Sequence, residues 1–124
     1  MNIVKSHREL RVYIRSFELS MEIFMLTKKF PNEEIYSLTD QIRRSSRSVS
    51  SNIAEAFRRR KYPKSFGSKL NESEAESAET QNWLDYALAC DYINQTDHKK
   101  IDDGYGEILG MLVKMQQTPE KWSI

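Results

Sequence analysis

The segment LTDQIRRSSRSVSSNIAEAFRRR, residues 38–60, decides the fold because its apolar residues recur at helical spacing. This spacing predicts a helix from about Ser37 or Thr39 to Arg60. One face of the helix carries Leu38, Ile42, Val49, Ile53 and Ala56 or Phe57. The positions between them hold small hydroxyl side chains, which allow a second helix to approach closely: Ser45, Ser46, Ser48, Ser50 and Ser51.

Two more helices are expected on the C-terminal side, from about Lys64 to Asp91 and from about Asp97 to Gln117. The apolar face of the first comprises Phe66, Leu70, Ser73, Ser77, Thr80, Leu84 and Ala87, and its small residues are expected to face the serine-rich segment. The second carries Ile101, Tyr105, Ile108, Leu112 and Met115. Its three glycines each cost about 1 kcal/mol relative to Ala, which indicates close backbone contact or local irregularity: Gly104, Gly106 and Gly110.

A helix from about Ser6 to Lys29 carries two apolar rows instead of one. One row comprises Leu10, Ile14, Phe17, Met21 and Phe24, and the other comprises Val12, Leu19, Ile23 and Leu26. Two rows indicate either a wide core face or a helix that packs on its own bundle and on a neighbour. In the second case we expect a charge at Ile14 to unfold the chain, and a charge at Ile23 or Leu26 to dissociate an assembly.

Length and composition suit one all-α domain spanning residues 1–124. Only four glycines and three prolines are present, so turns are few, near Pro31, Pro63 and Asn94. The fold class expected is an antiparallel up-and-down four-helix bundle without strands. The single cysteine, Cys90, is expected to be a small core residue and favours a cytoplasmic protein. We expect neither a signal peptide nor a membrane segment.

Charge is distributed unevenly, although the net charge is only +1. Residues 40–70 contain nine basic and two acidic side chains, a net +7, and residues 71–110 contain two basic and ten acidic side chains, a net −8. Seven basic residues are the candidate nucleic-acid-binding set, named the basic belt: Arg43, Arg44, Arg47, Arg58, Arg59, Arg60 and Lys61. Two alternative roles for these cations stay open, namely stabilisation of a helix C-terminus and pairing with Glu72, Glu76 and Glu79.

Catalytic, cofactor and metal motifs are missing from the sequence, so we expect no enzymatic activity, no cofactor and no metal. Neither His7 nor His98 follows a Glu by three residues, as a di-iron bundle requires. Asn52 and Glu55 flank the apolar face of residues 38–60 and are interpreted as structural polar residues. If they are buried, they require hydrogen-bond partners.

Several short motifs resemble a bacterial family, the four-helix bundle proteins, also called the intervening-sequence proteins of large-subunit ribosomal RNA genes. The motifs are Phe30-Pro31, Tyr36-Ser37-Leu38-Thr39, Gln41-Ile42-Arg43-Arg44, Ser48-Val49 and Asn52-Ile53-Ala54-Glu55, with Lys69-Leu70, Glu79-Thr80, Trp83-Leu84, Tyr92-Ile93, Met111-Leu112, Pro119 and Trp122 farther on. The resemblance implies a homopentamer of four-helix bundles around a central pore. A similar fold occurs in the accessory protein of diversity-generating retroelements, which is pentameric and binds a reverse transcriptase and nucleic acid.

Two functions are consistent with these features. The first is a non-catalytic homo-oligomer that binds RNA or DNA through the basic belt. The second is a protein–protein interaction scaffold that uses the same cations on an acidic partner, including a neighbouring copy of itself. The opposite charges of the two chain segments fit both, since contacts around a ring can match opposite charges.

Overall fold

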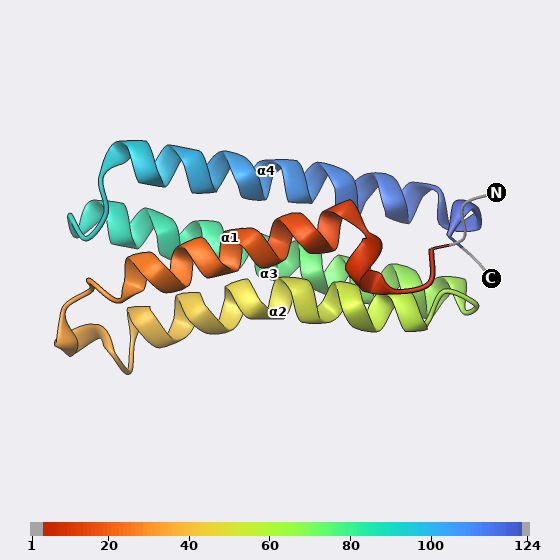
Figure 1. The fold of residues 1–124 in the computed structure, drawn as a ribbon, viewed down its shortest axis with the longest axis horizontal. Coiled ribbons are helices and arrows are strands. Elements are labelled where there is room, and N and C mark those ends of the chain that lie inside the picture. The colour runs from red at the N-terminus through yellow and green to blue at the C-terminus, as the bar shows by residue number, and fades with distance from the viewer. Residues whose placement is uncertain (1–3, 123–124) are drawn as a thin grey trace.

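Four α-helices make up most of the computed structural model, which describes residues 4–122. They are α1 (Arg11–Thr27), α2 (Leu38–Arg58), α3 (Pro63–Ala89) and α4 (Gln95–Gln117), with short 3-10 helices at His7–Glu9, Asn32–Glu34 and Pro119–Lys121. The all-helical prediction is confirmed, since no strand occurs in residues 4–122. The four helices lie side by side, with the α1–α2 and α3–α4 turns at one end and the α2–α3 turn at the other (Figure 1). None of them is long and apolar enough to span a bilayer.

The first helix begins five residues later than the predicted start at Ser6. Ser6 instead caps the short 3-10 helix, accepting a hydrogen bond from the Arg8 N–H while Glu9 accepts one from the Ser6 N–H. The backbone is then extended at the buried Leu10, and α1 starts at Arg11. At the other end of the chain, α4 starts two residues before the predicted Asp97, because the Asn94 side chain accepts from the Asp97 N–H.

Buried hydroxyl residues line the contact between α2 and α3, as the sequence predicts, although Ser51 of the predicted serine run is exposed. The Ser73 hydroxyl donates to the Val49 carbonyl across the two helices at 2.8 Å. The Thr80 hydroxyl lies 2.8 Å from the Ser45 hydroxyl, and both residues are buried. Each hydroxyl therefore has a partner inside the protein, which removes most of the cost of burying it.

The predicted roles of the two apolar rows on α1 are wrong for most of their residues, although Leu10 is buried as expected and Phe24 and Leu26 are half-buried. Val12, Leu19 and Ile23 lie in the core, whereas Ile14, Phe17 and Met21 are exposed. The core side of α1 also contains Ser16, Ser20 and Thr27, whose hydroxyls donate to carbonyls three residues earlier in the same helix. These internal bonds let short polar side chains occupy buried positions.

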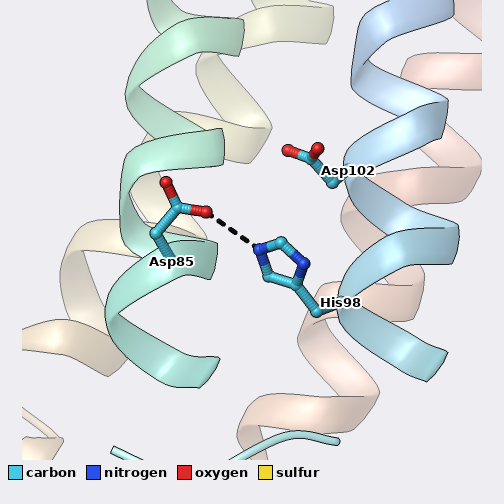
Figure 2. Close-up of side chains that lie close together, drawn as sticks. All are labelled: Asp85, His98 and Asp102. Carbon is cyan, nitrogen blue, oxygen red and sulfur yellow. Dashed lines mark hydrogen bonds and ion pairs between the residues drawn. The ribbon is translucent and has the colours of Figure 1, made fainter. Parts of the chain in front are cut away.

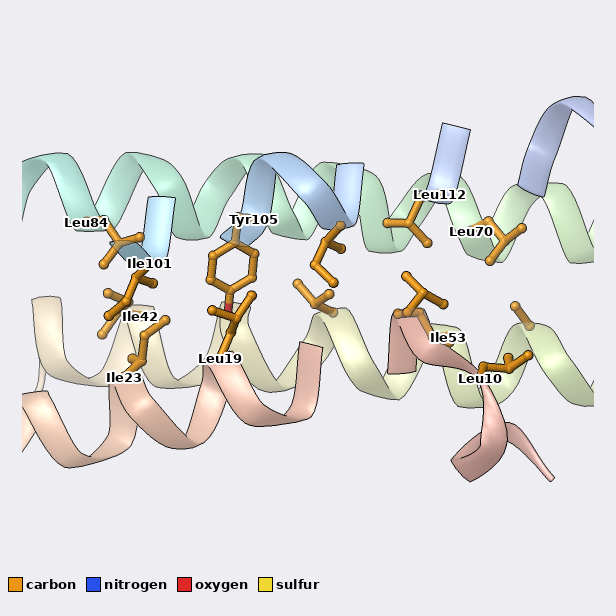
Figure 3. Packing of buried hydrophobic residues seen from close by; sticks show 14 of the residues in the cluster. Leu10, Leu19, Ile23, Ile42, Ile53, Leu70, Leu84, Ile101, Tyr105 and Leu112 are labelled. Carbon is orange, nitrogen blue, oxygen red and sulfur yellow. The ribbon is translucent and has the colours of Figure 1, made fainter. Parts of the chain in front are cut away.

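α1 and α4 pack closely together at Gly104. A Cβ atom there would lie 2.6 Å from Leu19 Cδ2, so the glycine permits the contact. Tyr105, the next residue, is fully buried and points from α4 toward Leu19 (Figure 3). The expectation of close backbone contact thus holds at Gly104, but a Cβ at Gly106 or Gly110 would meet open space.

Glu34 ties the α1–α2 turn to the α3–α4 turn at one end of the bundle. Its carboxylate accepts hydrogen bonds from the Ser37 hydroxyl, from the Tyr92 hydroxyl at 2.9 Å and from the Leu38 N–H at 3.2 Å. The Ser37 and Tyr92 hydroxyls, followed by the Leu38 N–H, lower the pKa of Glu34. The same carboxylate raises the pKa of Tyr92 to about 12.

Replacing Glu34 with Gln is expected to lower stability near neutral pH by on the order of 1 kcal/mol. A carboxyl with a lowered folded-state pKa stabilises the protein above its unfolded pKa, and this contribution is lost as pH falls through the folded value. The difference between wild type and Glu34→Gln should therefore shrink on acidification below the ordinary value of 4.5. Denaturant unfolding at several pH values measures it, with the exposed neighbour Glu33→Gln as control. A difference that stays constant from neutral to strongly acidic pH contradicts the assignment.

Candidate nucleic-acid interface

The basic belt lies along α2 and the turn that follows it, and it separates into two clusters. The α1–α2 cluster comprises Arg43, Arg44 and Arg47, and the α2-end cluster comprises Arg58, Arg59, Arg60 and Lys61. At 1.5 Å per residue, the 11 positions from Arg47 to Arg58 correspond to about 16 Å along the axis. One strand of a duplex has a phosphate about every 3.4 Å of axis, so the two clusters are roughly five phosphates apart.

The α1–α2 cluster is built against an aromatic ring of α1. Arg43 Nε donates to the Thr27 hydroxyl at 2.8 Å, and its guanidinium carbon lies 4.7 Å from the centre of the Phe24 ring. Arg47 approaches the same ring at 5.8 Å, and the Lys28 ammonium at 4.9 Å. Cation–π contacts and one hydrogen bond therefore hold these side chains in place before any partner binds.

The α2-end cluster also has contacts that fix its cations. Arg60 packs 3.6 Å from the centre of the Phe57 ring and donates from Nε to the Phe57 carbonyl at 2.9 Å. Burial and the neighbouring Arg58 charge lower the pKa of Arg60, yet a guanidinium stays protonated. Arg59 donates to the Ser65 hydroxyl at 3.2 Å. The charge of Arg58 also contributes to the lowered pKa of His7, after burial and Arg8.

Acidic side chains of the same chain leave most of the belt unneutralised. Within residues 4–122, the belt has one ion pair, Arg44 with Asp40 at 3.9 Å, in which Arg44 is exposed and Asp40 is half-buried. Such a pair contributes little. On α3, Glu72 pairs with Lys69 at 2.8 Å instead of reaching the belt. The pKa of Glu76 is raised by burial, and then by the nearby Glu79 and Glu72, so these acids crowd one another.

Asn52 and Glu55 have different environments, although both were interpreted as structural. Asn52 is half-buried, and its amide donates to the Ser48 carbonyl at 3.0 Å and to the Ser48 hydroxyl at 3.2 Å. Glu55 is exposed and pairs with Lys69 at 2.8 Å. Lys69 thus bridges Glu55 and Glu72, and these two bonds raise its pKa. The bridge connects α2 to α3 outside the belt.

One group of acidic and histidine side chains among the described residues is compact enough to hold a metal ion, namely Asp85, His98 and Asp102. Each offers one ligand atom, and these atoms all lie within 4.8 Å of one another. Asp85 comes from α3, and the other two come from α4 (Figure 2). His98 Nε2 lies 2.9 Å from Asp85 Oδ1, a contact that links the two helices. The Glu-x-x-His pattern of a di-iron bundle does not detect this group, because His98 and Asp102 are four residues apart. The interhelical hydrogen bond accounts for the arrangement without an ion.

The prediction for Cys90 is wrong, and the predicted set of site residues is incomplete. Cys90 is exposed at the C-terminal cap of α3, not in the core as expected, because α3 ends there and the chain turns away. Phe24 contacts Arg43 of the α1–α2 cluster, and Lys28 lies over the same ring, but neither was among the predicted site residues. They lie on another helix, and a charge count along residues 40–70 has no signal for them.

The comparisons with known proteins agree with the fold and with the resemblance seen in the sequence. Residues 8–114 match the 23S rRNA-intervening sequence protein family. A solved protein of unknown function from the S23 ribosomal protein family of Bacteroides thetaiotaomicron is 30% identical, with a TM-score of 0.78. The match covers 86% of this chain and 99% of that one. No curated protein matches. The chain therefore belongs to the 23S rRNA-intervening sequence protein family.

Proposed function

We propose that this protein is a non-catalytic, cytoplasmic homo-oligomer whose basic belt binds the sugar-phosphate backbone of RNA or DNA. The observation that carries the proposal is the belt itself, in which six of seven cations have no acidic partner within residues 4–122. The name of the family, which refers to 23S rRNA, supports RNA as the polyanion. Each subunit would be a single antiparallel up-and-down bundle.

The outer face of α1 supports the assembly. Ile14, Phe17, Met21 and Met25 are large apolar side chains, all about half exposed, on one helix. We name these four the outer row. A row of this kind is unusual on a monomer and is typical of a protein interface. A repeated head-to-tail contact gives a ring when the rotation between copies closes, and the resemblance to a pentameric family gives five copies as the expected number.

Contacts from arginine and lysine to phosphates are expected to bind many sequences with similar affinity. Such contacts position a strand, but they do not read its bases. Each subunit offers only a few cations, and a ring brings several sets of them onto one polyanion. The effective concentration of the second set then rises, so modest individual contacts give tight overall binding.

A protein scaffold is the second candidate function, and the acidic face of α3 favours it. Burial, followed by the nearby Glu79 and Glu72, raises the pKa of Glu76, and an approaching cation would relieve the repulsion among these acids. The belt of a neighbouring copy could supply such a cation. In that case the belt would hold the ring together and would not bind nucleic acid.

Replacing Arg58, Arg59 and Arg60 together with Gln separates the two functions. Under the nucleic-acid proposal, affinity for single-stranded RNA falls at least about tenfold, and the salt slope decreases by roughly two because each phosphate contact on a single strand contributes about 0.7. The oligomer mass stays the same. Fluorescence anisotropy and light scattering measure the two quantities.

The matched control removes three exposed lysines outside the belt, at Lys99, Lys114 and Lys121. Equal loss of RNA affinity in the control would mean that net charge alone matters, which contradicts the belt. If the wild type binds no RNA and the triple arginine variant loses its oligomer mass, the scaffold function is established instead.

A further inference from the structure

A pocket of about 400 Å³ lies between the C-terminal end of α1 and the first turns of α2. Four cations line it, of which Lys28 comes from the α1 side and Arg43, Arg44 and Arg47 come from α2. Its volume lies within the range typical of small-molecule sites. One acid, Asp40, also lines it. The pocket therefore has the strong positive charge that an anion requires.

Three of these cations are held around one ring in spite of their mutual repulsion. Phe24 has Arg43, Lys28 and Arg47 at 4.7, 4.9 and 5.8 Å from its centre. Arg43 uses Nε for the Thr27 hydroxyl, so its two terminal nitrogens have their donors available for a ligand. Like charges gathered in this way repel one another, and a bound anion would remove that repulsion.

A buried hydroxyl at the wall of the same pocket also has no partner. Thr39 is only 5% exposed and lines the pocket, and its Oγ1 makes no hydrogen bond to any residue between 4 and 122. Buried hydroxyls nearly always have a partner, and an anion in this cationic pocket would be an acceptor next to Thr39. Thr39 also lies in the first turn of α2, where the helix dipole favours negative charge.

We propose that this pocket binds one phosphate group of a nucleic-acid strand, with Lys28, Arg43 and Arg47 as the charged contacts and the Thr39 hydroxyl as a neutral donor. Arginine and lysine together suit a phosphate, because guanidinium gives paired donors and ammonium gives a compact charge. The proposal rests on the nucleic-acid function above and deepens it by assigning a defined phosphate site. The phosphate can belong to the internal backbone or to a strand end, since both present the same oxygens.

Asp40 provides a test with the opposite sign. Its carboxylate lines the pocket, 3.9 Å from Arg44, so its negative charge opposes an incoming anion. Replacing Asp40 with Asn should tighten phosphate binding. A gain of affinity after removing one acid cannot come from damage to the fold, so this variant complements those that lose affinity.

The experiment measures binding of inorganic phosphate to the full chain by isothermal titration calorimetry, with circular dichroism to verify folding. The double variant Lys28→Gln with Arg47→Gln should lose at least about tenfold in affinity, as expected for charged hydrogen bonds. Thr39→Val should weaken binding as well, because it keeps the shape and removes the donor. The control pair, Lys114→Gln with Arg11→Gln, removes the same charges outside the pocket and should leave the affinity unchanged.

Single-stranded RNA with a 5′-phosphate or a 5′-hydroxyl then identifies the source of the phosphate. Tighter binding of the phosphorylated strand assigns the pocket to a strand end, and equal binding assigns it to the backbone. Unchanged phosphate affinity in the double variant or equal loss in the control pair overturns the pocket. RNA binding that survives the double variant but is lost with Arg58, Arg59 and Arg60 leaves the proposed function intact without the pocket. Phosphate binding without RNA binding would support an anion site in the pocket but contradict the proposed nucleic-acid function.

Discussion

Replacing Ile23 with Asp is expected to unfold the chain, whereas replacing Phe17 with Asp should leave the helices folded and dissociate the oligomer. Both residues lie on α1, but Ile23 is 1% exposed and Phe17 is 49% exposed. A charge at Ile23 loses the apolar burial and places an unpaired carboxylate in the core, a cost of at least about 4 kcal/mol. This is comparable to the whole stability of many small domains. A charge at Phe17 meets water in the monomer and is buried only in an assembly.

Circular dichroism and light scattering on the purified variants measure these two effects. Phe17→Asp should retain the helical spectrum and shift toward the monomer mass of 14.6 kDa. Ile23→Asp should lose the spectrum. A Phe17→Asp protein with wild-type mass would show that the outer row is not an interface. A wild-type protein that is itself monomeric would contradict the ring.

Replacing Gly104 with Ala is expected to destabilise the bundle by about 1–3 kcal/mol, the usual cost of overpacking a core. The new Cβ would lie 2.6 and 3.0 Å from the two Leu19 methyl carbons and 3.1 Å from Arg15 Nη2. The Leu19 side chain is fully buried, so it cannot move aside without displacing its neighbours. α1 and α4 must therefore separate or repack.

Gly106→Ala is the matched control two residues away on the same helix. A Cβ there meets nothing within 4 Å, so the change should stabilise the protein by up to about 1 kcal/mol through helix propensity. Urea unfolding of the two variants gives the comparison. Equal effects of the two alanines would mean that the α1–α4 contact is looser than the structure has it.

Helix positions and the α2–α3 contact could be predicted from the sequence because they depend on local spacing. The apolar and small residues of α3, from Phe66 to Ala87, are buried as expected. The choice between the two rows of α1 could not be predicted, because both have helical spacing. The core-facing side of α1 includes the buried residues Ser16 and Thr27, whose hydroxyls bond within the helix. A search for apolar residues at helical spacing does not detect such polar residues.

The candidate site shows the same division between local and tertiary information. The α2 arginines stand out in the sequence because they are close together in the chain and carry charge. Lys28 and Phe24 approach Arg43 only because α1 packs against α2. Thr39 is one of several hydroxyl residues in the sequence, and only its buried, unpaired oxygen distinguishes it. The contacts of Lys28 and Phe24 with the α2 arginines and the unpaired Thr39 hydroxyl therefore require the fold.

Binding of wild-type protein to a single-stranded RNA of about 20 nucleotides, measured as salt is raised from about 50 to about 200 mM, tests the belt most directly. If about five belt cations contact phosphates, the logarithm of affinity should fall against the logarithm of salt with a slope near −3.5. The fourfold rise in salt then weakens binding by about a hundredfold. The absence of binding at the lower salt concentration, or an affinity that salt does not change, would contradict binding through the basic belt.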